Sequence, residues 1–269
     1  MLAILLSALL LAGPGAVGVT ERPFTVHAGG GVDLAATLTV PAGRGPHPAA
    51  VLVGGFGPAG RDGSLGDGGG PYRAMASGLA RDGVAVLRYD KRGLGASEGP
   101  PLSWLDRRPL AADVVAATRA LASLPGIDST RVAIVGHSQG GDLALEAART
   151  APAARVVTLS APGRPLGRLP RAVGAAGRVL SRLVGPEVAR ATLGRDPLAD
   201  AARARQPVLA VHGTADRTVP VSDLALLVGA RRAAGLSTRT LRVHGAGHFL
   251  QVEGRVPPTT VRQIAAFIR

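Results

Sequence analysis

The feature that most constrains the fold of this chain is the Gly-x-Ser-x-Gly segment at residues 136–140. A short apolar run rich in β-branched residues leads into the segment, and a helix-forming stretch at 142–150 follows it. The small residues permit a turn tight enough to hold the Ser138 hydroxyl above the end of a strand. This context favours a reactive serine over an incidental serine in a glycine-rich turn. A serine hydroxyl is a weak nucleophile at neutral pH, so the chain must also supply a base and an acid.

Two segments near the carboxyl end of the chain carry candidates for these groups. Asp216 lies in a turn that follows the apolar run 208–212, and His248 follows a Gly-Ala-Gly segment that leaves its imidazole free to reach across a loop. The chain order predicts Ser138 as nucleophile, Asp216 as the acid that orients the imidazole, and His248 as the base. The competing interpretation of Asp216 is a turn or cap aspartate.

The other histidines are interpreted as structural. His244 is the nearest competitor as base, but its place at the end of a strand favours a buried structural role. His137 is expected to be packed beside the serine, and His212 to be a hydrogen-bonding scaffold at the start of the acid turn.

Acyl transfer also needs N–H groups that stabilise an oxyanion. One is expected from Gln139, the residue after the serine. The second is expected from the Gly-Gly-Phe-Gly loop at 54–57, which follows the apolar run 49–53. We favour the N–H of Phe56, and the sequence leaves Gly55 open as the alternative.

Composition excludes several classes of protein. The chain has 269 residues, of which 46% are hydrophobic, and this suits one α/β domain. A net charge of +13 suggests a nucleic-acid partner, but the basic residues are scattered and only 3% of residues are aromatic, so no nucleic acid is expected. Attraction to an acidic surface or an anionic substrate stays open. The absence of cysteine excludes disulfides, thiolate metal sites and a cysteine nucleophile.

Motifs for cofactors are missing or lack their context. Gly55, Gly57 and Gly60 match the spacing of a dinucleotide fingerprint, but a Gly/Asp loop ending in Pro71 replaces the helix that should begin at the last glycine. No phosphate-binding Gly-Lys-Ser/Thr loop and no His-Glu-x-x-His zinc motif is present. We therefore expect no cofactor and no metal.

The amino-terminal residues predict export. Residues 2–12 are apolar and uncharged, and the Gly-Pro-Gly-Ala segment at 13–16 would end a helix and supply a cleavage site. We predict a signal peptide or an N-terminal anchor over 1–19, and an extracellular, periplasmic or membrane-anchored protein. No lysine or arginine precedes the apolar run, which departs from the usual pattern.

The remaining chain alternates between strands and helices. Such alternation predicts a mostly parallel sheet covered on both faces, with ligands bound beyond the carboxyl ends of its strands. The opening strands form a hairpin with its turn at 29–31. Strands are expected at 24–27, 34–40, 49–53, 84–89, 132–137, 154–160, 208–212 and 239–243, and helices at 72–81, 110–124, 142–150, 221–234 and 259–269.

Residues 163–205 interrupt this alternation of strands and helices. The stretch is helix-prone, rich in arginine and without a convincing strand, and it lies between two strands of the sheet, where an insertion would form a helical cap. Arg171, Arg178 and Arg182 fall on one helical face. The two interpretations are a solvated surface helix and a lid that attracts anionic substrates. Peripheral membrane association through the leader or this basic cap is a further hypothesis.

Together these residues resemble the α/β-hydrolase superfamily. The shared segments are GGFG at 54–57, RYDKRGLGASEG at 88–99, GHSQGG at 136–141, HGTAD at 212–216 and GAGHF at 245–249. The resemblance is nearest to exported bacterial serine esterases, including relatives of dienelactone hydrolases and prolyl-oligopeptidase-type domains. It implies an eight-stranded, mostly parallel sheet and a triad of Ser138, Asp216 and His248. Gly54 departs from the pattern, because many members carry a histidine there.

From the residues and the resemblance we predict a serine hydrolase that cleaves small-molecule carboxylic esters through an acyl-enzyme on Ser138. Its activity should rise through about pH 6–7, because the base must be neutral. The alternatives are a serine peptidase or acyltransferase on the same fold, a non-catalytic binding protein on a hydrolase scaffold, and a membrane-surface or nucleic-acid module. The acyl chain length, the alcohol and the oligomeric state do not follow from the sequence.

Overall fold

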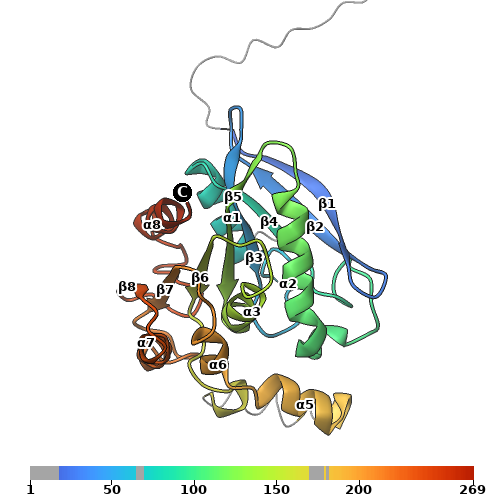
Figure 1. Cartoon of the computed structure of the whole chain (residues 1–269), viewed down its shortest axis with the longest axis vertical. Coiled ribbons are helices and arrows are strands. Elements are labelled where there is room, and N and C mark those ends of the chain that lie inside the picture. Colours follow the sequence, from blue (N-terminus) through green and yellow to red (C-terminus); the bar gives the residue numbers. More distant parts are fainter. Residues whose placement is uncertain (1–17, 65–69, 170–178, 180–181) are drawn as a thin grey trace, which may run out of the picture.

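The computed structural model of the chain describes residues 18–64, 70–169, 179 and 182–269. These residues build one twisted sheet with helices on both of its faces (Figure 1). The predicted leader at 1–19 falls almost entirely outside the described residues, as do Arg171 and Arg178 of the predicted basic cap face. Both stay predictions.

The sheet has eight strands in the order β1-β2-β4-β3-β5-β6-β7-β8. A hairpin opens it, and β2 pairs antiparallel with both β1 and β4, whereas every later pair is parallel. The prediction of an eight-stranded, mostly parallel sheet is therefore confirmed. The strands are β1 (Thr20–Ala28), β2 (Val32–Val40), β3 (His47–Val53), β4 (Ala85–Tyr89), β5 (Ile127–His137), β6 (Arg155–Leu159), β7 (Val208–Gly213) and β8 (Thr238–Val243).

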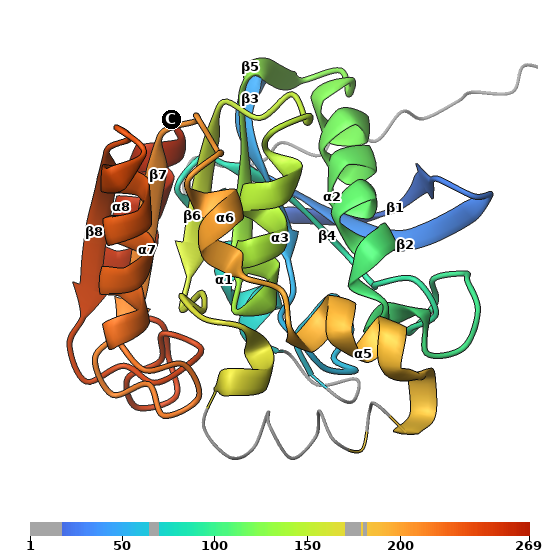
Figure 2. The same cartoon turned by 60° about the horizontal axis from the view of Figure 1, so that its bottom comes forward.

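Helices cover the two faces of the sheet unequally. In Figure 2, α2, α3, α6 and α7 stand in front of the sheet, while α1 and α8 pack against the other face. No helix in the described ranges combines the length and apolar character needed to cross a membrane. The helices are α1 (Pro71–Arg81), α2 (Arg107–Ala122), α3 (Gln139–Ala147), α5 (Pro186–Leu193), α6 (Pro197–Ala201), α7 (Ser222–Ala233) and α8 (Pro258–Ile268), with short 3₁₀ turns η1 (Ser103–Leu105) and η2 (Leu166–Arg168).

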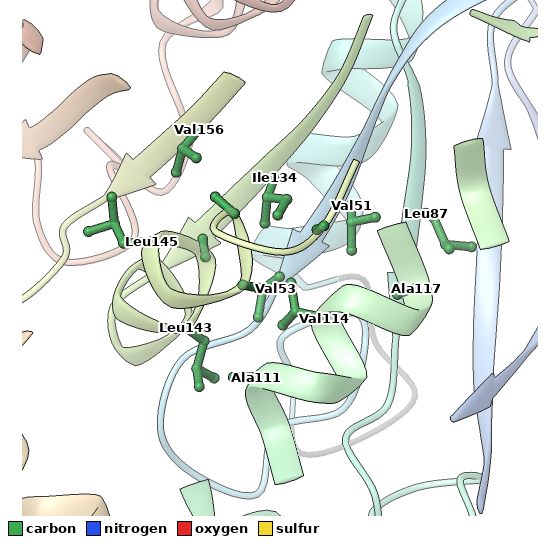
Figure 3. Close-up of a cluster of buried hydrophobic side chains, with 14 of the residues drawn as sticks. Val51, Val53, Leu87, Ala111, Val114, Ala117, Ile134, Leu143, Leu145 and Val156 are labelled. Carbon is green, nitrogen blue, oxygen red and sulfur yellow. The ribbon is translucent and has the colours of Figure 1, made fainter. Parts of the chain in front are cut away.

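The core follows from the alternation of side chains along the central strands. Val51 and Val53 of β3 face the α2 and α3 side, where Figure 3 shows Val53 beside Val114. Ala50 and Leu52 of the same strand face α1 and α8 instead. Because both faces are buried, these strands are continuous apolar runs, and they fix the level at which each strand ends.

The turn between β5 and α3 has the strained geometry that the Gly-x-Ser-x-Gly segment predicts. Ser138 has φ 54° and ψ −124°, a conformation that non-glycine residues rarely adopt. A Cβ atom on Gly136 would collide with the carbonyl oxygen of Gly140, which explains the need for glycine on this side of the turn. The predicted helix at 142–150 begins earlier, at Gln139, because the turn passes directly into it.

The stretch 163–205 divides between two places in the fold. Helix α6 packs against α3 and α7 and so belongs to the layer that covers the sheet. Helix α5 contacts α2 and η2, and in Figure 2 it crosses the lower side of the molecule, toward which the arrowheads of β6 and β8 point. Whether the whole stretch acts as a cap stays a prediction.

The glycine requirement of this turn can be tested by substitution. We expect Gly136→Ala to lower the free energy of unfolding by about 1–3 kcal/mol or more, because the added methyl group meets fixed backbone. The matched control is Gly229→Ala in α7, where nothing lies within 4 Å of the added carbon. That substitution should raise the free energy of unfolding by about 0.5–1 kcal/mol. Urea unfolding followed by circular dichroism measures both, and a Gly136→Ala protein as stable as the wild type would contradict the explanation.

Candidate active site

The predicted site residues come together at one edge of the sheet. Ser138 follows β5, Asp216 follows β7, His248 lies in the loop after β8, and the 54–57 loop follows β3. Because these strands are parallel, their carboxyl ends meet at the same edge. The sheet therefore gathers segments that are far apart in the sequence.

Asp216 and His248 form a direct hydrogen bond. The Nδ1 atom of His248 lies 2.8 Å from Oδ2 of Asp216, and the carboxylate is fully buried. Because an ionised carboxylate only accepts hydrogen bonds, Nδ1 carries the proton and Nε2 is left as the basic nitrogen. The acid therefore fixes the tautomer that a base needs.

The second oxygen of Asp216 is held by its own turn. Oδ1 accepts from the N–H groups of Thr218 and Val219, at 2.8 and 2.9 Å. Burial alone would raise the pKa of the Asp216 carboxyl, but the hydrogen bond to His248 and these N–H groups together lower it below its ordinary value. The carboxylate is thus ionised near neutral pH.

The structure also shows the positions of two other histidines near the site, His212 and His244. His212 is buried, and its Nε2 donates to the carbonyl oxygen of Val219, 3.0 Å away, as expected for a scaffold residue. The prediction of a buried structural role for His244 is wrong, because its side chain is exposed. The reason is that β8 is the last strand of the sheet, so alternate residues near its end face solvent.

The 54–57 loop approaches the serine closely. A Cβ atom on Gly55 would lie 3.0 Å from Cβ of Ser138, so the loop backbone lies next to this serine. The N–H of Gly55 already donates to the Tyr72 hydroxyl, 2.9 Å away. The N–H groups of Phe56 and Gln139, in contrast, have no hydrogen-bond partner within the described part of the chain.

His137 links this loop to the His248 loop. Its Nε2 lies 3.0 Å from the carbonyl oxygen of His248, which only accepts, so Nε2 carries the proton. Its Nδ1 must then accept from the Tyr72 hydroxyl, 2.9 Å away. The result is a directional chain from the Gly55 N–H through Tyr72 and His137 to the backbone of His248. The sequence predicted packing for His137 but gave no signal for Tyr72.

Packing around His137 completes the link. Its ring stacks on Phe249 at 4.6 Å between centroids, with an angle of 17°, and lies 4.6 Å from the ring of His248. Burial lowers the pKa of His137 to about 3, so this ring is neutral across the range in which most enzymes work. It therefore serves as a fixed hydrogen-bonding spacer and not as a second base.

Apolar side chains gather beside Phe56. Val219 of the acid turn packs with Leu166 and Leu169 from η2 and the residue after it, and Phe56 and Leu193 pack against this cluster. The ring of Trp104 lies 6.2 Å from that of Phe56. Residues from the 54–57 loop, the turn that carries Asp216 and the predicted cap thus meet in one apolar wall.

Asp90, in the strand-end turn after β4, has a structural explanation. It accepts hydrogen bonds from the backbone and side chain of Arg61 and from the N–H of Ala96. Arg92, two residues further along the chain, forms an ion pair with Asp113 of α2 and not with Asp90. Among residues 18–64, 70–169, 179 and 182–269, no group of three or more His, Asp or Glu side chains is arranged to hold a metal ion.

Sequence comparisons find relatives over parts of the chain. The model of a hydrolase family described as serine aminopeptidase S33 matches residues 65–188. Esterase EstD of Thermotoga maritima is 34% identical over 149 residues, which cover 54% of this chain and 33% of that protein. A thiohydrolase of Arthrinium phaeospermum is 32% identical over 91 residues, which cover 34% of this chain and 30% of that protein. The chain thus spans about a third of the length of either relative.

Solved structures match over nearly the whole chain. An esterase of Pyrococcus furiosus superposes with a TM-score of 0.70 at 17% identity, covering 96% of this chain and 95% of that one. Est1E of Butyrivibrio proteoclasticus, solved with ferulic acid bound, superposes with a TM-score of 0.67 at 18% identity, covering 91% and 98%. The chain has the α/β-hydrolase fold.

The buried neutral His137 predicts an acid-dependent loss of stability. Its pKa is about 3 in the folded chain against 6.5 as the ordinary value, so its contribution is complete above pH 6.5 and is lost as the pH falls toward 3. Between about pH 7.5 and 5, the wild type should lose about 2 kcal/mol more of its free energy of unfolding than His137→Gln. Urea unfolding at the two pH values measures this difference.

The control for this prediction is His244→Gln, because His244 is exposed. That variant should lose as much stability as the wild type between the two pH values. Equal losses in the wild type and His137→Gln would show that the ring is not held neutral.

Proposed function

We propose that the chain is a serine hydrolase that cleaves small-molecule carboxylic esters through an acyl-enzyme on Ser138. The observation that carries the proposal is the hydrogen bond of His248 Nδ1 to the buried Asp216 carboxylate, which leaves Nε2 as the base at the edge where β5 presents Ser138. The esterase names of the relative from Thermotoga maritima and of the structure from Pyrococcus furiosus support an ester substrate. The ferulic acid bound to Est1E supports a small molecule.

The proposed reaction has two halves, acylation of Ser138 and hydrolysis of the acyl-enzyme, and the same groups act in both. His248 Nε2 takes the proton of the Ser138 hydroxyl while Oγ bonds to the acyl carbon, and the carbonyl oxygen becomes an oxyanion. The N–H groups of Phe56 and Gln139 stabilise that oxyanion. Collapse breaks the bond to the alcohol, which leaves with the proton held by His248. Water then repeats the sequence on the acyl-enzyme and releases the acid.

The choice of Phe56 over Gly55 has a physical basis. A donor can stabilise an oxyanion only if it is not already satisfied. The Gly55 N–H donates to Tyr72, whereas the Phe56 N–H has no partner within the described residues. The Gln139 N–H lies at the first position of α3, where the helix dipole adds to the attraction.

A serine peptidase is the second candidate, and the match to the family described as serine aminopeptidase favours it. The two reactions share the nucleophile, so labelling of Ser138 does not separate them. Hydrolysis of a p-nitrophenyl ester beside an aminoacyl p-nitroanilide does. We expect the ester to be the better substrate by kcat/KM, and a preference for the anilide would establish the peptidase.

The proposal predicts the behaviour of Ser138→Ala. Intact-mass measurement after treatment with a fluorophosphonate should show one adduct in the wild type and none in the variant, and ester hydrolysis should fall by roughly 10⁴-fold or more. The control is Ser123→Ala, an exposed serine after α2, which should label and react like the wild type. No adduct in the wild type would overturn the proposal and leave a non-catalytic scaffold as the better account.

A further inference from the structure

Lys91 is buried beneath the 54–57 loop. It is the only lysine among the 31 basic residues of the chain, and it is 5% exposed. Its Nζ donates to the carbonyl oxygens of Gly55 and Gly57, at 2.5 and 2.9 Å. The carboxylate next to it in the chain, Asp90, is engaged by Arg61. No carboxylate in the described ranges forms an ion pair with Lys91.

The two carbonyl groups that Lys91 holds lie on either side of Phe56. The Gly55 carbonyl and the Phe56 N–H belong to one peptide unit, which is planar and trans, so the two groups point in opposite directions. A hydrogen bond that fixes the carbonyl of Gly55 therefore also fixes the direction of the Phe56 N–H. On the other side of this unit, the Gly55 N–H is held by Tyr72.

We propose that Lys91 is a positioning residue for the oxyanion site, because its ammonium group holds the Gly55–Phe56 peptide with the Phe56 N–H directed away from itself and toward Ser138. This inference rests on the proposed function. The ammonium also draws electron density toward the Gly55 carbonyl oxygen, which strengthens the N–H at the other end of the same peptide as a donor. Lys91 itself does not contact the substrate in this account.

The surroundings explain why a compact ammonium suits this position. Nζ lies 5.7 Å from the centre of the Trp104 ring, and the ring of Phe56 also packs against that of Trp104. An ammonium has three N–H bonds that can rotate to serve two carbonyls and leave one toward an aromatic face. A guanidinium is planar, and its donors form a rigid fork that matches carboxylates. Little water reaches the group, since Lys91 is only 5% exposed, and this burial lowers its pKa to about 7.

The test compares Lys91→Met with a matched buried cation outside the site. Arg231 is 1% exposed and donates to the carbonyl oxygens of Ala201, Ala204, Gln206 and Ser237. Arg231→Met should lower the melting temperature and leave kcat within about twofold, since it removes only structural bonds. Lys91→Met should lower kcat for a p-nitrophenyl ester by roughly 10- to 100-fold with KM within about threefold, because an oxyanion donor acts in the transition state.

A thionoester substrate separates the oxyanion site from a general loosening of the loop. Sulfur is a weak hydrogen-bond acceptor, so the reaction of a thionoester depends little on the N–H donors. We expect Lys91→Met to slow the oxygen ester far more than the matching thionoester. Equal losses on both substrates, or a kcat equal to that of the wild type, would overturn the role of Lys91 while the proposed function stands. A wild type that neither hydrolyses esters nor labels at Ser138 would overturn both.

A second measurement on the wild type does not depend on the folding of a variant. Because the chain has one lysine, protein grown with ¹⁵N-lysine gives one side-chain nitrogen signal. We expect its chemical shift to change once a phosphonate on Ser138 places a phosphoryl oxygen against the Phe56 N–H, because Lys91 holds the other end of the same peptide. A signal that the phosphonate leaves unchanged would overturn the proposal.

Discussion

A non-glycine residue at φ 54° raises the free energy of the folded chain, and the backbone packed around Ser138 keeps it there. The Ser138 N–H donates to the carbonyl oxygen of Leu159 at 2.8 Å, and its own carbonyl accepts from Gly141 at 2.9 Å. On the other side, a Cβ on Gly140 would collide with the backbone of Val53 and Gly54. The turn can neither relax nor shift, so the strands β3, β5 and β6 that enclose it determine where the serine stands.

The other loops of the site are positioned by buried hydrogen bonds between them. One chain of bonds runs from Gly55 through Tyr72 and His137 to the backbone of His248, and Lys91 holds the same loop from below. Each member is satisfied, which makes such a network rigid where a partly satisfied one would be costly. The catalytic groups in the proposed function thus depend on buried neighbours for their geometry.

The parts of this account that the sequence predicted are those with a local pattern. Continuous apolar runs separated by amphipathic stretches predict a parallel sheet, and the chain order of Ser138, Asp216 and His248 follows from short motifs at strand ends. The roles of Tyr72 and Lys91 could not be predicted, because they depend on contacts between segments 17 and 36 residues apart that no spacing encodes. His244 was misjudged for a related reason: strand position alone does not tell which face of an edge strand meets solvent.

The central claim is that Ser138, the Phe56 and Gln139 N–H groups and His248 surround one reacting carbon. A crystal structure of the protein after reaction with a fluorophosphonate tests it most directly, because the tetrahedral phosphorus resembles the intermediate of acyl transfer. The account predicts phosphorus bonded to Oγ of Ser138, with its phosphoryl oxygen about 2.7–3.1 Å from the backbone nitrogens of Phe56 and Gln139. A phosphoryl oxygen hydrogen-bonded to the Gly55 N–H in place of the Phe56 N–H, or a phosphonate on any other residue, would contradict it.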